Sequence, residues 1–267
     1  MDGDFQQRGS SNGKDRRNTD IIQRIAEDLL NIGVKQGGVL LVHASLRAMG
    51  HVKGGAETVI LGLLEALGSK GTLLMPALSY EHVTPDSPVF DVRRTPSNVG
   101  AIPECFRGRF NTKRSIHPTH SVCSVGPLSD KLLQHHYLDS TPCGPNSPFR
   151  LLRCFGGQIL MLGCGLQPNT SMHALEELIE PPYLFGPELT YQLVLNDSQV
   201  IEKMYRPHNF NGYKQRYDRI GQLMHNQRLK TGTILNASCH LLDAQALWDT
   251  ALPVLQRHPF YFVDRID

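Results

Sequence analysis

A short polar stretch, NTSMHALEE, contains the side chains best suited to chemistry. His173 stands three residues before Glu176 and four before Glu177, so within a helix either carboxylate can reach the imidazole. A carboxylate partner fixes the tautomer of a histidine and stabilises its protonated form, which makes the ring a better general base. Thr170 adds a hydroxyl at the start of this helix, where exposed N–H groups suit a developing oxyanion. The alternative is a capped helix that carries a solvent-facing His–Glu pair.

A second cluster, RSIHPTHS, holds two histidines in an HxxH arrangement, His117 and His120. Two imidazoles at this spacing can ligate zinc, but the neighbouring sequence offers no third ligand, so no metal site is predicted. Pro118 disfavours a helix and leaves a loop ahead of the next strand. The loop therefore either lines a cleft or is held by its own hydrogen bonds.

Two further features bear on binding and on nucleophilic catalysis. Gly54 and Gly55 open a predicted helix, where free N–H groups attract phosphate, although the chain has neither a Walker loop nor a GxGxxG motif. A GxSxG elbow is also absent from the sequence. Cys164, nine residues before His173, allows a Cys–His–Glu hydrolase, but a buried loop thiol is the favoured interpretation.

The elements that must position these residues follow from hydrophobic patterning. Residues 38–42, 72–75 and 159–162 are short apolar runs typical of strands buried on both faces, and 56–67 has a helical pattern. Residues 38–76 thus form a strand–helix–strand unit with parallel strands. Further strands are predicted at 121–125 and 233–235, with a hairpin at 191–205. Further helices are expected at 99–107, 129–136, 148–155, 213–224 and 243–256, and from about residue 171.

The predicted fold class is therefore α/β, with a mixed central β-sheet flanked by helices. Residues 1–17 are polar and predict a frayed tail before a helix that starts near Asn18. Residues 77–97 hold three prolines and predict a long, loop-rich, functional insertion. With no repeat or linker, residues 18–267 are expected to form one domain.

Composition excludes several classes of protein. The 267 residues carry a formal net charge of +2 with 19% charged side chains, which disfavours a dedicated nucleic-acid binder. No apolar run approaches the roughly 18 residues of a membrane span, and the first residues lack the apolar core of a secretory signal. The six cysteines form no CxxC pair. A cytoplasmic protein that binds neither nucleic acid nor membrane is expected.

Several short motifs of this sequence, taken in their order along the chain, resemble those of the aminoglycoside 3-N-acetyltransferases. This is the antibiotic N-acetyltransferase family, which is distinct from the general control-type acetyltransferase fold. The matching stretches are VHASL at 42–46, GTLLMP at 71–76, TPSNVGAIPE at 95–104, RSIHPTHS at 114–121, Gly144 with Ser147-Pro148, and NTSMH at 169–173 with Glu176. The resemblance extends from about residue 19 to the end, and six motifs in the same order make it specific.

The resemblance implies transfer of an acetyl group from acetyl-CoA, the co-substrate, to a primary amine, the 3-amino group of an aminoglycoside. His173 would be the general base, Glu176 would hold it, and Thr170 would donate to the oxyanion. Acetyl-CoA would contact Ser45, Leu46, Gly54, Gly55, Arg114, Ser115, Ser121 and Val122. The acceptor would contact Tyr80, Glu81, His120, Asn169 and Glu177. A homodimer is also expected among the partners.

Other functions remain open at this stage. Residues 79–86, the expected acceptor loop, hold only two carboxylates, whereas a polycationic acceptor favours a carboxylate-rich cleft. An amino sugar or a nucleotide-linked amino sugar is therefore the alternative acceptor. A hydrolase that uses Cys164 with His173, and a CoA-binding protein without catalytic activity, are the remaining alternatives.

Overall fold

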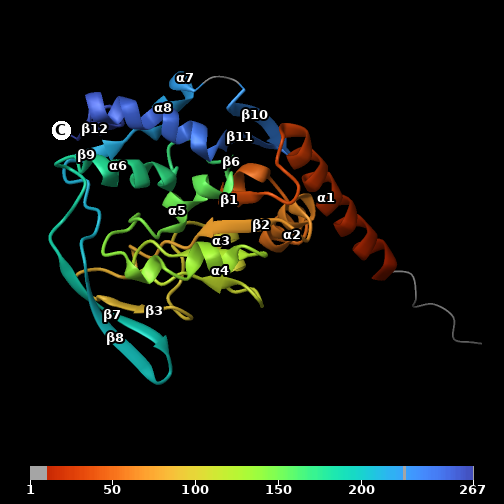
Figure 1. Ribbon diagram of the computed structural model, residues 1–267. Helices are drawn as coiled ribbons and strands as arrows, with labels where there is room; N and C mark the ends of the chain where they lie inside the picture. Colours follow the sequence, from red (N-terminus) through yellow and green to blue (C-terminus); the bar gives the residue numbers. More distant parts are fainter. Residues whose placement is uncertain (1–10, 225–226, 267) are drawn as a thin grey trace, which may run out of the picture.

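A seven-stranded mixed sheet forms the centre of the protein (Figure 1). The computed structural model describes residues 11–224 and 227–266. The strands of this sheet are β1 (Val39–Ala44), β2 (Thr72–Pro76), β4 (Lys113–Arg114), β5 (Val122–Val125), β6 (Gln158–Leu162), β10 (Leu229–Ile234) and β11 (Ala237–Asp243). Their order is β10-β11-β6-β1-β2-β5-β4. The predicted α/β class with a mixed central sheet is confirmed.

The middle strands are apolar throughout because both of their faces are buried. In β1, Leu41 packs into the core on one face of the sheet and Leu40 into the core on the other. The same alternation occurs in β6, where Met161 and Leu160 face opposite cores. Continuous apolar runs, rather than alternating ones, are the expected signature of such strands.

Strands β6, β1 and β2 are mutually parallel, and the rest of the large sheet is antiparallel. Helix α2 (Gly55–Leu67) connects β1 to β2, which confirms the predicted strand–helix–strand unit. Because parallel strands point the same way, the carboxyl ends of β6, β1 and β2 lie along one edge of the sheet. In open α/β sheets, ligands bind at such an edge.

Helices cover both faces of the sheet. The remaining ones are α1 (Ser11–Ile32), α3 (Ala101–Arg107), α4 (Ser129–Leu133), α5 (Pro148–Leu151), α6 (His173–Ile179), α7 (Ile220–Leu223) and α8 (Ala244–Arg257). Helices α1, α2 and α3 share one core, whereas α4 to α8 contribute to the other. Helix α1 begins at Ser11, so the prediction of a frayed tail is wrong for residues 11–17, and residues 1–10 lie outside the described part. No proline interrupts this segment, and extending an existing helix costs little.

Two small sheets lie beside the large one. Strand β3 (Val89–Asp91) pairs in parallel with β7 (Leu189–Asn196), which forms the predicted hairpin with β8 (Gln199–Tyr205). The segment 77–97 is therefore partly a strand rather than loop throughout. Strand β9 (Tyr213–Gln215) pairs with β12 (Val263–Arg265), so the predicted helix over 213–224 is wrong in its first turn. Pairing with a distant strand overrode the local pattern there.

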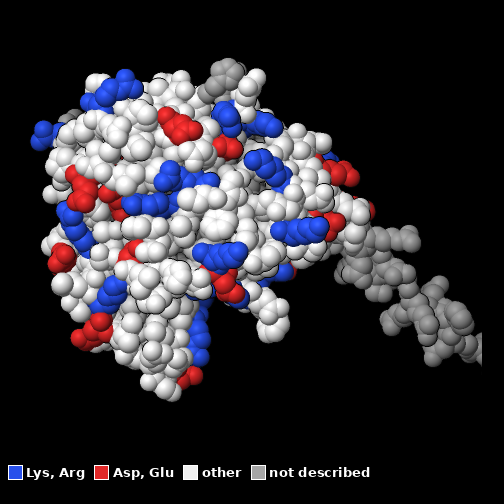
Figure 2. All heavy atoms as spheres, in the orientation of Figure 1, with Lys and Arg blue, Asp and Glu red and all other residues white. Residues whose placement is uncertain are grey.

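The surface mixes charges of both signs. On the face shown in Figure 2, basic and acidic side chains are interspersed rather than grouped by sign. Several form exposed ion pairs, such as Lys113 with Asp130 and Arg206 with Glu180. None of the helices in the described part of the chain has the length and apolar character needed to cross a membrane.

Candidate active site

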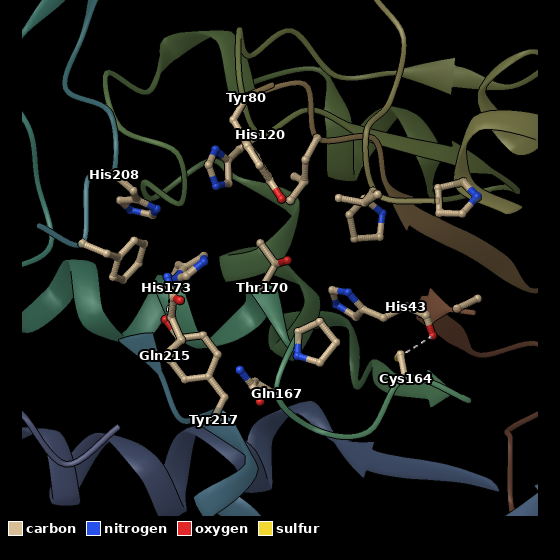
Figure 3. Close-up of a pocket in the computed structure, with 17 residues that line it drawn as sticks. His43, Tyr80, His120, Cys164, Gln167, Thr170, His173, His208, Gln215 and Tyr217 are labelled. Atoms are coloured by element: carbon tan, nitrogen blue, oxygen red, sulfur yellow. Dashed lines mark hydrogen bonds between the residues drawn. The ribbon is translucent and has the colours of Figure 1, made fainter. Parts of the chain in front are cut away.

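A cavity of about 660 Å³ opens at the carboxyl edge of the parallel strands. His43 and Ala44 at the end of β1, and Pro76 at the end of β2, form part of its wall. The loop after β6 and the first turn of α6 supply Thr170 and His173 (Figure 3). The predicted base and the predicted oxyanion donor therefore line the same cavity, as their position after a buried strand suggested.

His173 and Glu176 form a buried pair on one helical face. The His173 Nδ1 lies 3.0 Å from Glu176 Oε2, which confirms that the two side chains meet. The Glu176 side chain is fully buried, and it also accepts hydrogen bonds from the hydroxyls of Tyr217 (2.7 Å) and Tyr183 (3.0 Å). An ionised carboxylate only accepts, so it holds the imidazole proton on Nδ1. The lone pair of His173 is then on Nε2, where a general base requires it.

Burial keeps both tyrosines in their neutral, donating form. Desolvation, with the charge of Glu176, raises the pKa of Tyr217 and that of Tyr183 above the usual range. Tyr217 also lines the cavity, and its hydroxyl lies 2.9 Å from His173 Nδ1. Tyr183 was missed in the sequence because no local pattern links it to Glu176.

A second histidine–carboxylate pair, His208 with Glu177, lies at the same wall of the cavity. His208 lines the cavity, and its Nε2 lies 2.8 Å from Oε1 of Glu177. Glu177 also accepts from the Thr141 hydroxyl (2.6 Å) and the Cys143 N–H (2.7 Å). Burial is the main cause of the raised pKa of Glu177. Glu177 was predicted to contact the acceptor, but the structure places it behind His208, which sequence reasoning missed.

The other predicted acceptor contacts divide into two groups. Tyr80 and His120 line the cavity, and Tyr80 is about half exposed at 48%. Glu81 is exposed and does not belong to the lining. Asn169 is fully buried, and its side chain accepts from the Ser171 N–H, so it caps the turn that carries Thr170. The structure therefore brings Tyr80 and His120, but not Glu81 or Asn169, to the cavity.

Two of the predicted CoA contacts adjoin this cavity along the chain, and two more lie at the start of α2. Ser45 and Leu46 follow Ala44, which lines the cavity at the end of β1. Gly54 and Gly55 have φ angles of +80° and +61° and start α2. A Cβ at Gly55 would meet nothing within 4 Å, so the backbone there is open to an approaching group. This is the helix start at which the sequence predicted a phosphate.

The other four predicted CoA contacts are engaged inside the protein. The Arg114 guanidinium donates to the Ser121 hydroxyl (2.8 Å), to Thr95 O (2.6 Å) and to Ala77 O (3.0 Å). Its mostly desolvated position lowers its pKa to about 10. The Ser115 hydroxyl accepts from the Val122 N–H. None of Arg114, Ser115, Ser121 and Val122 is in the lining of the cavity.

The two histidines of the HxxH stretch face different surroundings. His117 is buried beneath the cavity wall, where its Nδ1 accepts from the His120 N–H (3.0 Å) and its ring stacks on His136. His120 instead reaches the cavity beside His173 and His208 (Figure 3). The pair therefore does not act as one unit: His117 holds the loop and His120 lines the cleft.

Cys164 lines the cavity but is poorly suited to nucleophilic attack. Desolvation raises the pKa of its thiol to about 11, so almost none of it is thiolate at neutral pH. Its Sγ lies 3.5 Å from His43 O, a backbone acceptor. This favours the interpretation of Cys164 as a partly buried loop thiol.

We expect the buried histidines to make the protein sensitive to acid. Desolvation lowers the pKa of His43 to about 3 and that of His136 to about 4, and it lowers the pKa values of His117, His120 and His208 well below 6.5. The unfolded chain binds protons that the folded one does not, so stability falls as pH drops below about 6.5. Each histidine contributes up to about 1.4 kcal/mol per pH unit in that window.

The measurement is Tm by circular dichroism between about pH 7.5 and about pH 5, a range that brackets an ordinary histidine pKa. His136→Gln retains a side chain that can reach the Ser115 hydroxyl and Pro142 O but removes one titrating group. Its Tm should therefore decline less steeply with acid than that of the parent. Parallel declines in the two proteins would show that His136 does not contribute to the sensitivity.

Comparison with known proteins gives a consistent result. The sequence model of a family described as aminoglycoside 3-N-acetyltransferase matches residues 41–256. The chain is 31% identical to aminoglycoside N(3)-acetyltransferase IV from Salmonella sp over 238 residues, which are 88% of this chain and 87% of the relative.

Solved structures show the same fold. A variant of aminoglycoside acetyltransferase AAC(3)-IVa in complex with a gentamicin is 30% identical with a TM-score of 0.76, and the match covers 89% of each chain. AAC-IIIb in a binary complex with CoASH has a TM-score of 0.78 at 24% identity, covering 88% of this chain and 96% of that one.

Proposed function

The chain belongs to the aminoglycoside 3-N-acetyltransferase family of acyltransferases, and we propose that it transfers the acetyl group of acetyl-CoA to a primary amine, with His173 as general base. The observation that carries this proposal is the buried chain of hydrogen bonds from Tyr217 and Tyr183 through Glu176 to His173 Nδ1. This chain of hydrogen bonds engages Nδ1 of His173 and leaves its Nε2 as the basic atom, and His173 lines the cavity.

The reaction follows from this placement. A primary amine is mostly protonated at neutral pH and must lose a proton before it can attack. Once that proton has gone to solvent, His173 Nε2 takes a second proton, from the neutral amine, while the nitrogen bonds to the thioester carbon. The carbonyl becomes a tetrahedral oxyanion, to which the Thr170 hydroxyl is placed to donate. Collapse breaks the C–S bond, and the proton on His173 passes to the departing CoA thiolate. No covalent enzyme intermediate is needed.

The start of α2 is the proposed site for a phosphate of CoA. The Gly55 N–H donates to Val52 O (2.9 Å), whereas the N–H groups that follow it in the first turn have no partner within the helix. Gly55 leaves the approach to them open. A solved relative with this fold holds CoASH, which supports CoA as the carrier of the acyl group.

A carboxylate at the start of α2 should weaken acetyl-CoA binding. We expect Gly55→Asp to raise the KM for acetyl-CoA by about tenfold, roughly 1.4 kcal/mol, because it repels a phosphate at the helix terminus. Gly156→Asp is the matched control, since Gly156 has a similar φ of +59° and equally open surroundings at the end of another helical turn. Equal KM values in the two variants would argue against a phosphate site at α2.

For the acceptor, the family favours an aminoglycoside, and a structure of AAC(3)-IVa holds a gentamicin. One observation favours a second candidate, an amino sugar of lower charge. The described residues that line the cavity include no aspartate or glutamate, whereas carboxylates attract a polycation. Both candidates use the same chemistry at His173 and differ only in the acceptor.

The test is release of free thiol from acetyl-CoA with a panel of amines, with the acetylated product identified by mass spectrometry. Gentamicin, glucosamine and a nucleotide-linked glucosamine form the panel. Acetylated gentamicin supports the first acceptor and an acetylated mono-amine sugar the second. Thiol release that leaves every amine unmodified would contradict transfer and favour the hydrolase alternative, in which case Cys164→Ala should abolish it. CoA binding without any turnover would favour the non-catalytic alternative.

A further inference from the structure

Three imidazoles that come from distant parts of the chain meet on one wall of the cavity. His120 precedes β5, His173 begins α6 and His208 follows β8 (Figure 3). One ligand nitrogen from each lies within 4.8 Å of the others. The ring centroids are 4.8 Å apart for His173 and His208, 5.2 Å for His120 and His208, and 6.0 Å for His120 and His173.

These spacings fit ligation of one metal ion. With Zn–N bonds of about 2.0 Å in tetrahedral geometry, the centres of two ligating imidazoles lie about 5 Å apart. The observed separations bracket that value, so only small ring movements are needed. Three histidines with one coordination position left open form a common zinc arrangement.

Each ring also has its second nitrogen held by a neighbour. His173 Nδ1 pairs with Glu176, His208 Nε2 pairs with Glu177 at 2.8 Å, and His120 Nδ1 lies 2.9 Å from the Thr119 hydroxyl. Partners of this kind, carboxylates above all, orient the histidines that bind metals in proteins. The remaining nitrogens, Nε2 of His173 and His120 and Nδ1 of His208, are the ones left to bind a metal ion.

One of these nitrogens has no hydrogen-bond partner among the described residues. The His208 Nδ1 is buried, makes no hydrogen bond there and belongs to a side chain that is 3% exposed. A buried polar atom without a partner is costly, and a metal ion would satisfy it. The two carboxylates behind the rings, Glu176 and Glu177, also place negative charge next to this point.

We propose that His120, His173 and His208 bind a divalent transition-metal ion, Zn²⁺ in the first instance, whose open coordination position faces the cavity. Imidazole nitrogen is a preferred ligand of zinc. The metal would occupy Nε2 of His173, the atom that takes the amine proton in the proposed reaction. Zinc and acetyl transfer therefore exclude each other, and zinc acts as an inhibitor that chelators remove. This last consequence rests on the proposed function, whereas the binding site does not.

Zinc binding is measured on the full-length chain without a polyhistidine tag, by competition with a chromophoric chelator. We expect one Zn²⁺ per chain, and visible absorption bands of histidine-bound cobalt when Co²⁺ replaces it. His208→Ala and His120→Asn should each weaken zinc binding by at least about tenfold. His135→Ala, which removes an exposed histidine outside the cluster, should leave the affinity unchanged.

Glu177→Gln tests the partner of His208 without removing a ligand. It should weaken zinc binding by about 10- to 100-fold, as for other partners of metal-bound histidines. Circular dichroism and Tm of every variant exclude unfolding as the cause. Equal zinc affinity in the parent and in His208→Ala and His120→Asn would overturn the proposal, and so would an equal loss in His135→Ala. None of these measurements needs transferase activity, so the metal site can fail while the proposed function stands, or the reverse.

Discussion

Replacing His173 by alanine should reduce the kcat of acetyl transfer by about 100- to 10,000-fold, the range that general-base catalysis contributes. The variant removes the imidazole paired with Glu176, so the amine proton loses its acceptor at that point of the cavity. The expected CoA subsite at the start of α2 involves a different part of the chain. The Kd for CoA should therefore stay within about twofold of the parent value.

The measurements are steady-state kinetics with the acceptor identified in the panel, and titration calorimetry with CoA. Glu176→Gln is the companion variant: glutamine can still accept a hydrogen bond, but it lacks the charge that stabilises the imidazolium. It should lower kcat by less than His173→Ala does. His135→Ala controls for the loss of an exposed histidine. Undiminished turnover in His173→Ala would remove His173 from the role of base.

Arg114→Ala should destabilise the fold by about 2–5 kcal/mol. The guanidinium holds three chain segments together through Ser121, Thr95 O and Ala77 O. Its removal takes a donor from all three acceptors, although Ala77 O still accepts from the Ser121 hydroxyl. It also lies 4.8 Å from the centre of the Phe90 ring in β3, which links the small sheet to the large one. We therefore expect a lower urea midpoint rather than a selective effect on CoA.

Urea unfolding and CoA titration of the same samples separate the two roles of Arg114. Arg114→Lys keeps the charge but lacks the planar fork of donors, so it should lose less stability than Arg114→Ala. The lysine variant replaces the alanine variant in both measurements if the latter fails to fold. Arg93→Ala is the surface control, because Arg93 pairs with Asp197 in an exposed position and should change the midpoint little. Normal stability with weakened CoA binding in Arg114→Ala would instead support the contact that the family resemblance implied.

The parts of the site that lie close together in the sequence could be predicted from it. His173 and Glu176 are three residues apart, so a helix alone brings them together. The β1–α2–β2 unit likewise follows from two apolar runs, a helical pattern and Gly68, which ends the helix. Local patterns were enough because each contact is made within one element or between neighbouring elements.

Contacts between distant segments could not be predicted in the same way. His208 and Glu177 are 31 residues apart and meet only because the β7–β8 hairpin returns the chain to the cavity. Arg114 is a similar case, since the family resemblance implied a contact with CoA, whereas its hydrogen bonds are to Ser121, Thr95 O and Ala77 O from separate parts of the chain. A residue type specifies what a side chain can bind, but tertiary packing decides which partner reaches it.

The place of β11 in the large sheet has a consequence for synthesis on the ribosome. Strand β6 is flanked by β1 on one side and by β11 on the other, and β11 is made about 75 residues later along the chain. A chain that folds from its N-terminus while it is being translated therefore exposes one edge of β6 until β11 emerges. An unpaired apolar edge is a template for association with other chains. Tyr217, which completes the bonding of Glu176, precedes β11, so His173, Glu176 and Tyr217 are all synthesised before the strand that closes the sheet.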